Sequence, residues 1–304
     1  MIQFPPLDPE MADLAGKNLI FKIGPPDQGE RLDRFTAQVS GLSRSKIRLL
    51  IDFGAVWVRG RACRQQSKAL RDGDWVTLQV PTYGPVRFYE IDPARILHED
   101  EWLVAYDKEA GLPSQQTPYD AHNNLFAALR RRDPDGYLAL HHRLDRLTSG
   151  VMVFGRHKGA NQGLSRLFSQ GDMEKRYLAV VDGVPERDEW EVDRPIAKRK
   201  GSYYCPTDAP GRPARTLFTV LARGANRALV QARPLTGRTH QIRLHLNACG
   251  HAILGDAAYG GPPARRLMLH AARLAFNHPV TRAALVIEAS PPEAFDPGNL
   301  DSRP

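Results

Sequence analysis

Apolar residues recur along this chain in two rhythms, one typical of helices and one typical of strands. Positions three and four apart, beginning with Leu32 and Phe35, predict a short helix over residues 30–39. A second helix is predicted to begin after Ser43, a favoured N-cap residue type, and to end at Gly54. Both helices would bury one apolar stripe and leave a polar face to the solvent.

Beyond this first segment, runs typical of strands outnumber helical ones. Two more helices are predicted over residues 123–132 and 158–170. The predicted strands cover 55–58, 75–80, two short strands within 96–107, 138–140, 151–154, 176–181, 216–221, 229–232, 267–276 and 284–287. Because strands dominate and helices are few, we expect the α+β class with a largely antiparallel sheet.

Changes in composition along the chain predict two domains of unequal size. We expect an irregular arm over residues 1–17, a small α+β domain over 18–80, a linker over 81–90, a main domain over 91–290 and an irregular tail over 291–304. The chain has 304 residues, of which 42% are hydrophobic, and this is enough for one medium core and one small core.

The overall charge favours an anionic partner. The net charge is +8 and the pI about 9.5, which indicates nucleic acid first and an anionic membrane surface second. Three widely separated cysteines form no disulfide framework and no zinc motif. The N-terminus lacks the pattern of a secretory signal, and no apolar run reaches the ~18 residues of a membrane span. We therefore expect a soluble, cytoplasmic protein that does not bind membranes.

The positive charge is concentrated in the predicted small domain. Between positions 43 and 71 eight basic residues face a single acidic one, Asp52. We predict that this surface contacts RNA, because each phosphate contact by a basic side chain adds affinity. The residues chosen for this role are Arg44, Lys46, Arg48, Arg59 and Arg61. The alternative is a helix face that is charged only for solubility.

The stretch from His142 to Gly150 carries the chemistry of the chain. It places the carboxylate of Asp145 between Arg143 and Arg146, before a Thr-Ser-Gly turn. Nearby cations keep a partly buried carboxylate ionised, and arginines also match phosphate oxygens. Taken alone, the same tetrapeptide would be an ordinary surface ion pair.

Two further motifs change that interpretation. One is Lys-Arg-Tyr-Leu-Ala-Val-Val-Asp-Gly over residues 175–183, and the other is Gly-Arg-Thr-His-Gln-Ile-Arg-Leu-His over residues 237–245, followed by Gly255-Asp256. In this order the three motifs closely resemble the pseudouridine synthases of the RluA type, over roughly residues 91–290. The resemblance implies the pseudouridine synthase fold and the isomerisation of uridine to pseudouridine in structured RNA. It implies no metal and no small-molecule cofactor.

The resemblance also implies a role for individual residues. Asp145 would be the nucleophile, Tyr177 would stack on the uracil and take part in proton transfer, and Arg243 would be the partner of the carboxylate. Arg143 would help to hold open the base stack, with Arg146 beside it on the RNA. From the residues alone, Tyr177 could equally be a core tyrosine and Arg243 a surface arginine. We expect Thr239 to cap the helix that carries Arg243.

The small domain resembles the RNA-binding module named after ribosomal protein S4. The resembling segments are residues 31–35, 42–47, 54–60 and 73–76. Arg59 departs from this pattern, because the family often has Asn there. The main domain also departs at its first motif, where Asp107-Lys108-Glu109 replaces Asn-Lys-Pro and adds a negative charge near the expected RNA site.

Three alternatives stay open. Members of the family with such a module mostly act on large-subunit ribosomal RNA, so that substrate is expected, with transfer RNA second. A non-catalytic RNA-binding or ribosome-assembly factor would explain the basic domain but not the three motifs. A metal hydrolase is disfavoured, because His240 and His245 are five positions apart and would not share one face of a helix or strand. We expect the protein to be a monomer.

Overall fold

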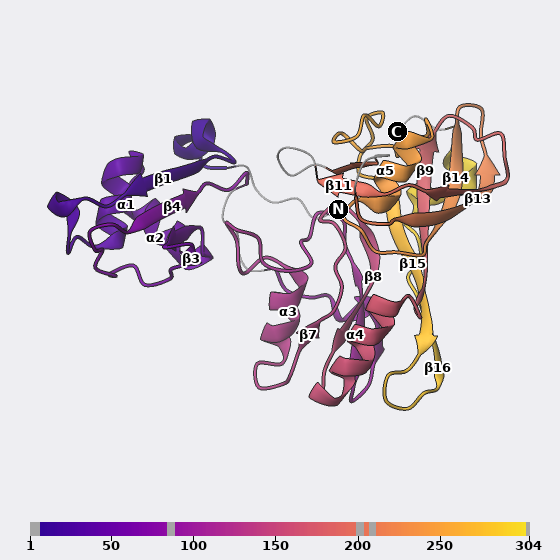
Figure 1. Ribbon diagram of the computed structural model, residues 1–304, viewed down its shortest axis with the longest axis horizontal. Coiled ribbons are helices and arrows are strands. Elements are labelled where there is room, and N and C mark those ends of the chain that lie inside the picture. The colour runs from indigo at the N-terminus through magenta and orange to yellow at the C-terminus, as the bar shows by residue number, and fades with distance from the viewer. Residues whose placement is uncertain (1–6, 84–88, 199–203, 207–210, 302–304) are drawn as a thin grey trace. The chain divides into compact units, whose positions relative to one another are not determined.

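The computed structural model describes residues 7–83, 89–198, 204–206 and 211–301 (Figure 1). The chain forms two compact units. The smaller unit comprises Ile2–Ile91 and Gln115–Arg132, and the larger unit comprises Asp92–Ser114 and Asp133–Pro304. The segment 115–132, which the sequence placed in the main domain, thus clusters with the N-terminal residues. Within the smaller unit, the indole nitrogen of Trp57 donates to the carbonyl of Pro118 at 3.0 Å.

The smaller unit combines short helices with a four-stranded antiparallel sheet in the order β1-β4-β2-β3. Its strands are β1 (Asn18–Lys22), β2 (Val56–Val58), β3 (Arg61–Ala62) and β4 (Trp75–Gln79). Its helices are α1 (Leu32–Ser40), α2 (Arg44–Phe53) and α3 (Leu125–Arg132), with 3-10 turns η1 (Pro9–Leu14) and η2 (Pro25–Asp27). The predicted helices and the strands β2 and β4 are therefore present, whereas β1 and β3 were not anticipated.

The predicted apolar stripes of α1 and α2 form the core of the smaller unit. Leu32 and Ile47 are fully buried there. Gly54 adopts the left-handed conformation that ends α2, with φ of 83°. Ser43 occupies the N-cap position as predicted, but its hydroxyl contacts Ser45 instead of a backbone N–H.

Two predictions at the edges of the smaller unit need correction or fall outside the description. In the arm expected to be irregular over residues 1–17, the described part contains η1, which buries Met11 in the core. Leu7, Met11 and Leu14 stand four and three positions apart and all contact this core, a helical spacing that the prediction of an irregular arm overlooked. In the expected linker, Tyr83 is buried and its hydroxyl bonds Asp120 at 3.3 Å. Residues 84–88 of that linker lie outside the described residues.

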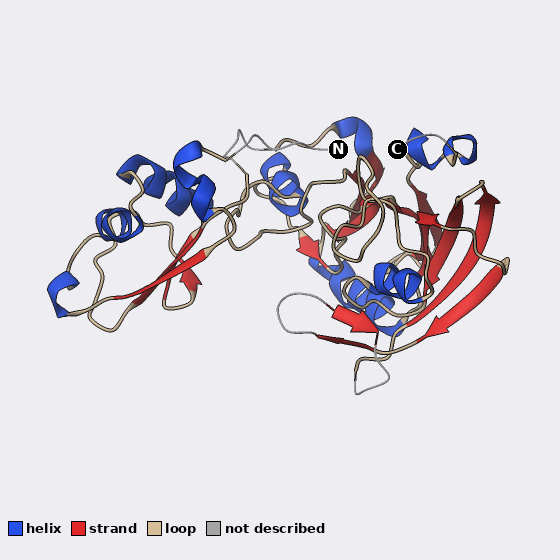
Figure 2. Ribbon diagram, turned by 90° about the horizontal axis from the view of Figure 1, so that it is seen from above, coloured by secondary structure: helices blue, strands red, loops and turns tan. Residues whose placement is uncertain are grey.

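The larger unit is built on a ten-stranded mixed sheet (Figure 2). Its main path runs β10-β13-β14-β9-β15-β8-β6-β5, while β16 pairs with β15 and β7 with β8. The strands are β5 (Ile96–Glu99), β6 (Leu103–Lys108), β7 (Ala139–Leu140), β8 (Ser149–Gly155), β9 (Glu174–Asp182), β10 (Glu189–Asp193), β13 (Arg215–Arg223), β14 (Arg227–Pro234), β15 (Leu269–Asn277) and β16 (Ala284–Glu288). Only the β8–β15 pair is parallel, so the predicted α+β class with a largely antiparallel sheet is confirmed.

Short elements complete the larger unit. They are the 3-10 turns η3 (Pro93–Arg95) and η4 (Lys158–Ala160), the helices α4 (Asn161–Gln170) and α5 (Gln241–Ala248), and a two-stranded sheet of β11 (Ile196–Lys198) and β12 (Tyr204–Pro206). The strands β10, β11 and β12 were not predicted. The tail is more regular than expected, because η5 (Glu293–Phe295) and η6 (Pro297–Asn299) bury Phe295 and Leu300 in the core around β9 and β14.

Candidate active site

The Asp145 loop joins β7 to β8 and is held at several points by hydrogen bonds. The hydroxyl of Ser114 donates to the carbonyl of Leu144 at 2.6 Å and lies 3.1 Å from the Leu144 N–H. The N–H of Thr148 donates to the carbonyl of Asp145 at 3.1 Å and closes a turn. The carboxyl group of Asp145 is therefore presented by a fixed loop, with 24% of its side chain exposed.

Lys108 is buried beneath this loop. Its ammonium donates to the carbonyls of Glu109, Leu112 and Arg146 at 2.9, 2.8 and 3.2 Å, and the side chain is fully buried. Burial lowers the pKa of Lys108 to about 7. Glu109, the unusual residue of the first motif, forms an ion pair with Arg95 at 3.5 Å. The first motif therefore braces the Asp145 loop from inside the unit.

Arg243 connects two carboxylates. One of its terminal nitrogens lies 3.3 Å from Oδ2 of Asp145, while its Nε and other terminal nitrogen donate to both oxygens of Asp256 at 2.7 and 2.6 Å. Its side chain is 7% exposed and that of Asp256 1%. Burial opposes the charge of Arg243, but hydrogen bonds and attraction from Asp256 raise its pKa. The predicted Asp145–Arg243 pair is thus present, with an additional anchor.

The helix that carries Arg243 begins differently from the prediction. The N-cap of α5 is His240, with a left-handed φ of 57°, and no side chain caps the helix. Thr239 was the predicted cap. The left-handed turn brings Nε2 of His240 to 3.6 Å from Oδ2 of Asp145, and Nδ1 to 2.7 Å from the hydroxyl of Tyr259. Burial lowers the pKa of His240.

Tyr177 projects from β9, between β14 and β15, where it pairs with Ala232 and Ala271. Burial, and secondly the negative charge of Asp145, raise the pKa of its hydroxyl. Tyr177, Asp145 and Arg243 all line one cavity of about 310 Å³. The structure thus brings the three predicted catalytic residues to one place.

The predicted RNA-binding arginines of the motif differ in position. Arg143 is exposed and lines the cavity. Arg146 is also exposed but is absent from the cavity wall, and its backbone carbonyl accepts hydrogen bonds from Lys108 and from the N–H of Gly111. Of the two arginines, Arg143 therefore belongs to the cavity wall and Arg146 does not.

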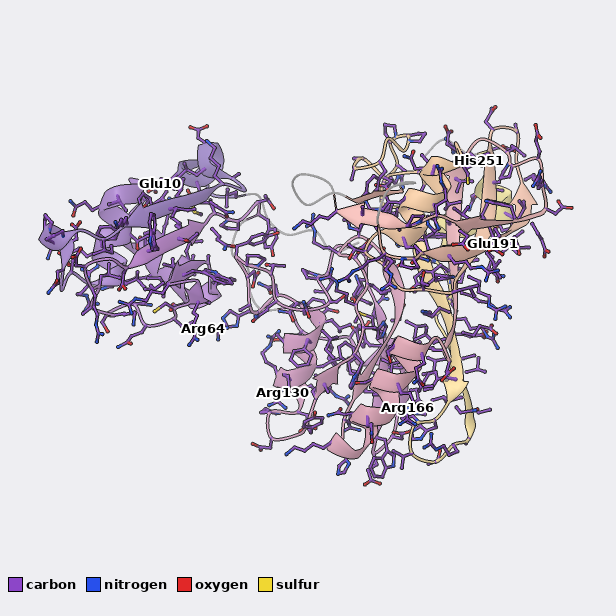
Figure 3. All side chains as sticks on the ribbon, in the orientation of Figure 1. Glu10, Arg64, Arg130, Arg166, Glu191 and His251 are labelled. Atoms are coloured by element: carbon purple, nitrogen blue, oxygen red, sulfur yellow. The ribbon has the colours of Figure 1, made fainter. Side chains whose placement is uncertain are left out.

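The predicted basic surface of the smaller unit is largely ion-paired. Arg31, Arg44 and Arg48 all bond the buried carboxylate of Asp33. The side chains of these three arginines are each about half exposed. Lys46 pairs with two carboxylates, Asp8 at 2.7 Å and Glu10, and Arg59 pairs with Asp74. Arg61 is exposed and has no ion pair among the described residues, and Arg64 projects from the same unit (Figure 3).

Sequence reasoning left three contributors to the site without a role: Asp256, His240 and Tyr259. The guanidinium of Arg243 lies 4.9 Å from the ring centre of Tyr259, so all three surround the same arginine. The Gly-Asp pair after the third motif was the available signal for Asp256. Among the described residues, no group of three or more His, Cys, Asp or Glu side chains is placed to hold a metal ion. His245 instead bonds Thr216 and a backbone carbonyl. The described residues also contain no helix that is long and apolar enough to cross a membrane.

Comparison with known proteins defines the class to which this fold and cavity belong. The family model described as RNA pseudouridylate synthase matches residues 102–248. A solved structure, human RNA pseudouridylate synthase domain containing 4, matches with a TM-score of 0.57 and 26% identity, over 68% of this chain and 92% of that one.

Curated relatives agree and cover more of the chain. An uncharacterized RNA pseudouridine synthase of Aquifex aeolicus is 35% identical over 91% of this chain and 94% of its own length. The dual-specificity RNA pseudouridine synthase RluA of Pasteurella multocida is 40% identical over 64% of this chain and 92% of its own length. Ribosomal large subunit pseudouridine synthase D of Zymomonas mobilis is 31% identical over 87% of this chain and 91% of its own length. The chain therefore belongs to the RNA pseudouridine synthase family and is an enzyme of that family, as its motifs predicted.

Proposed function

We propose that this enzyme isomerises uridines of large-subunit ribosomal RNA, with Asp145 as its nucleophile. The substrate is supported by relatives named ribosomal large subunit pseudouridine synthases C and D, which are 32% and 31% identical to this chain over 89% and 87% of its length. Transfer RNA is the second candidate, because the relative with 40% identity is named a dual-specificity enzyme.

One observation carries the role of Asp145. Its carboxylate is partly exposed on the cavity wall, and its oxygen Oδ2 lies 3.3 Å from a buried guanidinium. The reaction breaks the bond between C1′ of ribose and N1 of uracil, forms a bond from C1′ to C5, and exchanges the C5 proton for one on N1. It consumes no oxidant and no second substrate. An ionised carboxylate can add to the sugar or to the base and hold the intermediate while the base turns.

The surrounding residues then take complementary roles. Arg243 orients the carboxylate of Asp145, because two hydrogen bonds to Asp256 hold the guanidinium in place. Tyr177 lies under the uracil, and since burial raises its pKa, its hydroxyl stays protonated near neutral pH and can donate a hydrogen bond. Arg143 at the cavity helps to stabilise the extruded nucleotide.

The smaller unit supplies further RNA contacts in this proposal. It acts as the S4-like module, with Arg44, Lys46, Arg48, Arg59 and Arg61 directed to phosphates. The half-exposed arginines around Asp33 support this role, because one buried carboxylate leaves the three-arginine cluster with a net positive charge. We further propose that the enzyme acts as a monomer in the cytoplasm.

Asp145→Asn tests the nucleophile. Transcribed large-subunit RNA labelled with tritium at C5 of uridine releases tritium as pseudouridine forms. We expect the variant to release none above background while it binds RNA with the affinity of the wild type. Asp182→Asn, at an exposed aspartate of the same unit, is the matched control and should keep full activity. An active Asp145→Asn enzyme would refute the assignment.

Pseudouridine mapping tests the substrate. Total RNA from cells that lack the enzyme should lose one or more pseudouridines in large-subunit ribosomal RNA, and the wild-type gene should restore them. Loss confined to transfer RNA would favour the second candidate, and an unchanged map would refute both.

A further inference from the structure

Lys175 lies inside the candidate active-site cavity but has no role in the chemistry described so far. It precedes Tyr177 by two positions in β9, where the neighbouring strand β15 bulges between Ala271 and Arg273 while β9 itself runs on without an extra residue. Residues two apart in a strand face the same side, roughly 7 Å from each other. Both side chains line the cavity that also holds Asp145.

The ammonium group of Lys175 lacks a partner. Across residues 7–83, 89–198, 204–206 and 211–301, no carboxylate or hydrogen-bond acceptor engages it. Its neighbour Glu174 faces the other side of β9, where Arg176 and Arg273 take up its carboxylate at 2.6 and 2.7 Å. Burial lowers the pKa of Lys175, with no hydrogen bond or opposite charge acting against it.

The ionisable groups nearest to Lys175 on the cavity wall are engaged with other partners. Asp145, the carboxylate on the cavity wall, is engaged by Arg243 and lies 3.6 Å from His240. His142 stacks on Phe168 at 4.2 Å, and its Nε2 accepts from the N–H of Val153. Burial, and secondly the charge of Lys175, lower the pKa of His142 to about 3, so this wall is neutral at physiological pH. The ammonium group of Lys175 thus has no direct ion-pair partner on the described cavity wall.

We propose that Lys175 binds a phosphate of the RNA chain at the target nucleotide. Leaving an ammonium group partly desolvated without a counter-charge is costly, and an incoming anion relieves that cost. Uracil is neutral and cannot do so, whereas every nucleotide brings a phosphate within one sugar of its base. A base against Tyr177 therefore places a phosphate within reach of the neighbouring Lys175. This proposal depends on the RNA-modifying function proposed above and adds a substrate contact to it.

Lys175→Met tests the contact, because methionine keeps the length of the side chain and removes its charge. With a synthetic stem-loop around the uridine identified by mapping, we expect KM to rise about 10- to 100-fold with kcat little changed, as for a lost charged hydrogen bond in uniform binding. The slope of log(kcat/KM) against log[salt] should become shallower by roughly 0.7, the value of one phosphate contact on a single strand. Arg176→Met, on the opposite face of β9, is the matched control and should change neither quantity.

A neutral phosphate in the RNA supplies the decisive measurement. Methylphosphonate linkages are introduced one at a time beside the target uridine and assayed with both enzymes. At one linkage the wild type should lose as much as Lys175→Met does, and the variant should lose almost nothing more, because both changes remove the same contact.

Three outcomes would count against the proposal. Additive losses at every linkage, an unchanged salt slope, or an equal loss in Arg176→Met accompanied by a lower melting temperature would each overturn the phosphate contact. Failure of the proposed function is distinguishable, because the wild type would then modify no RNA of either class.

Discussion

The buried Arg243–Asp256 pair gives the sharpest prediction from this structure. Asp256→Asn keeps the shape of the side chain but removes its charge and one of its two acceptor oxygens. Both partners are almost fully buried, at 7% and 1% exposure, and both hydrogen bonds are short, at 2.7 and 2.6 Å. Solvent therefore cannot replace the lost carboxylate oxygen.

The cost follows from burial. Removing one partner of a buried ion pair costs about 3–5 kcal/mol, because the remaining charge is left uncompensated. Asparagine keeps one acceptor, so we expect about 3 kcal/mol, the lower end of that range. We also expect kcat to fall about 10²-fold, since a displacement near 1 Å at a catalytic group has that effect. The displaced group here is the Arg243 guanidinium beside Asp145.

Native-state hydrogen exchange is the suitable assay, because it reports the free energy of opening at individual amides. The amides of α5 should lose protection in Asp256→Asn, while those of α1 and α2 in the smaller unit should not. Glu191→Gln is the matched control. Glu191 forms a bidentate pair with Arg215, at the exposed surface of β10 (Figure 3).

Surface pairs contribute little, so Glu191→Gln should leave protection and activity at the wild-type level. Equal effects of the two substitutions would refute the argument from burial. Full activity in Asp256→Asn would show that Asp145 does not need a fixed Arg243.

Two further predictions concern buried ionisable groups. Burial lowers the pKa of Lys108 to about 7, below the value of about 10.4 in the unfolded chain, so between these values the unfolded state binds more protons. The unfolding free energy should therefore rise with pH across that window, by at most about 1.4 kcal/mol per pH unit. Urea unfolding measured at several pH values should show a smaller rise for Lys108→Met than for the wild type. Burial raises the pKa of Tyr177, so the plot of kcat against pH should show no change due to its ionisation below its ordinary pKa of ~10. Tyr177→Phe should reduce kcat yet bind RNA like the wild type. A fall or rise of kcat near neutral pH that disappears in Tyr177→Phe would contradict a protonated hydroxyl.

The sequence predicted the elements that carry their own periodic signal. The helices α1 and α2 were found because each repeats apolar residues over at least two turns and ends at a favourable residue, such as Gly54. The strands β11 and β12 span three residues each and carry no such run, whereas β10 alternates polar and apolar residues and was overlooked. Phe295 lies in a 3-10 turn of three residues, which is too short to show a period, whereas Met11 shares a helical spacing with Leu7 and Leu14 that was overlooked.

The candidate site was predictable where a motif marked it and unpredictable where it depends on contacts between distant segments. Asp145, Tyr177 and Arg243 stand in motifs and meet at one cavity. The cap of α5 was missed because it depends on a left-handed backbone at His240, which few residues other than glycine adopt. Asp256 follows Arg243 by 13 positions and Asp145 precedes it by 98, so only folding unites the three.

The unequal contacts of Arg243 fit the role of nucleophile that we propose for Asp145. Its two bonds to Asp256 are 2.6 and 2.7 Å long and fully buried, whereas its contact with Asp145 is 3.3 Å and partly exposed. The shorter pair fixes the guanidinium in place, and the longer contact orients Asp145 without engaging all of its oxygen lone pairs. A nucleophile needs both an ionised state and a free lone pair. If the distances were reversed, Arg243 would engage both oxygens of Asp145 tightly, and fewer lone pairs would remain for the substrate.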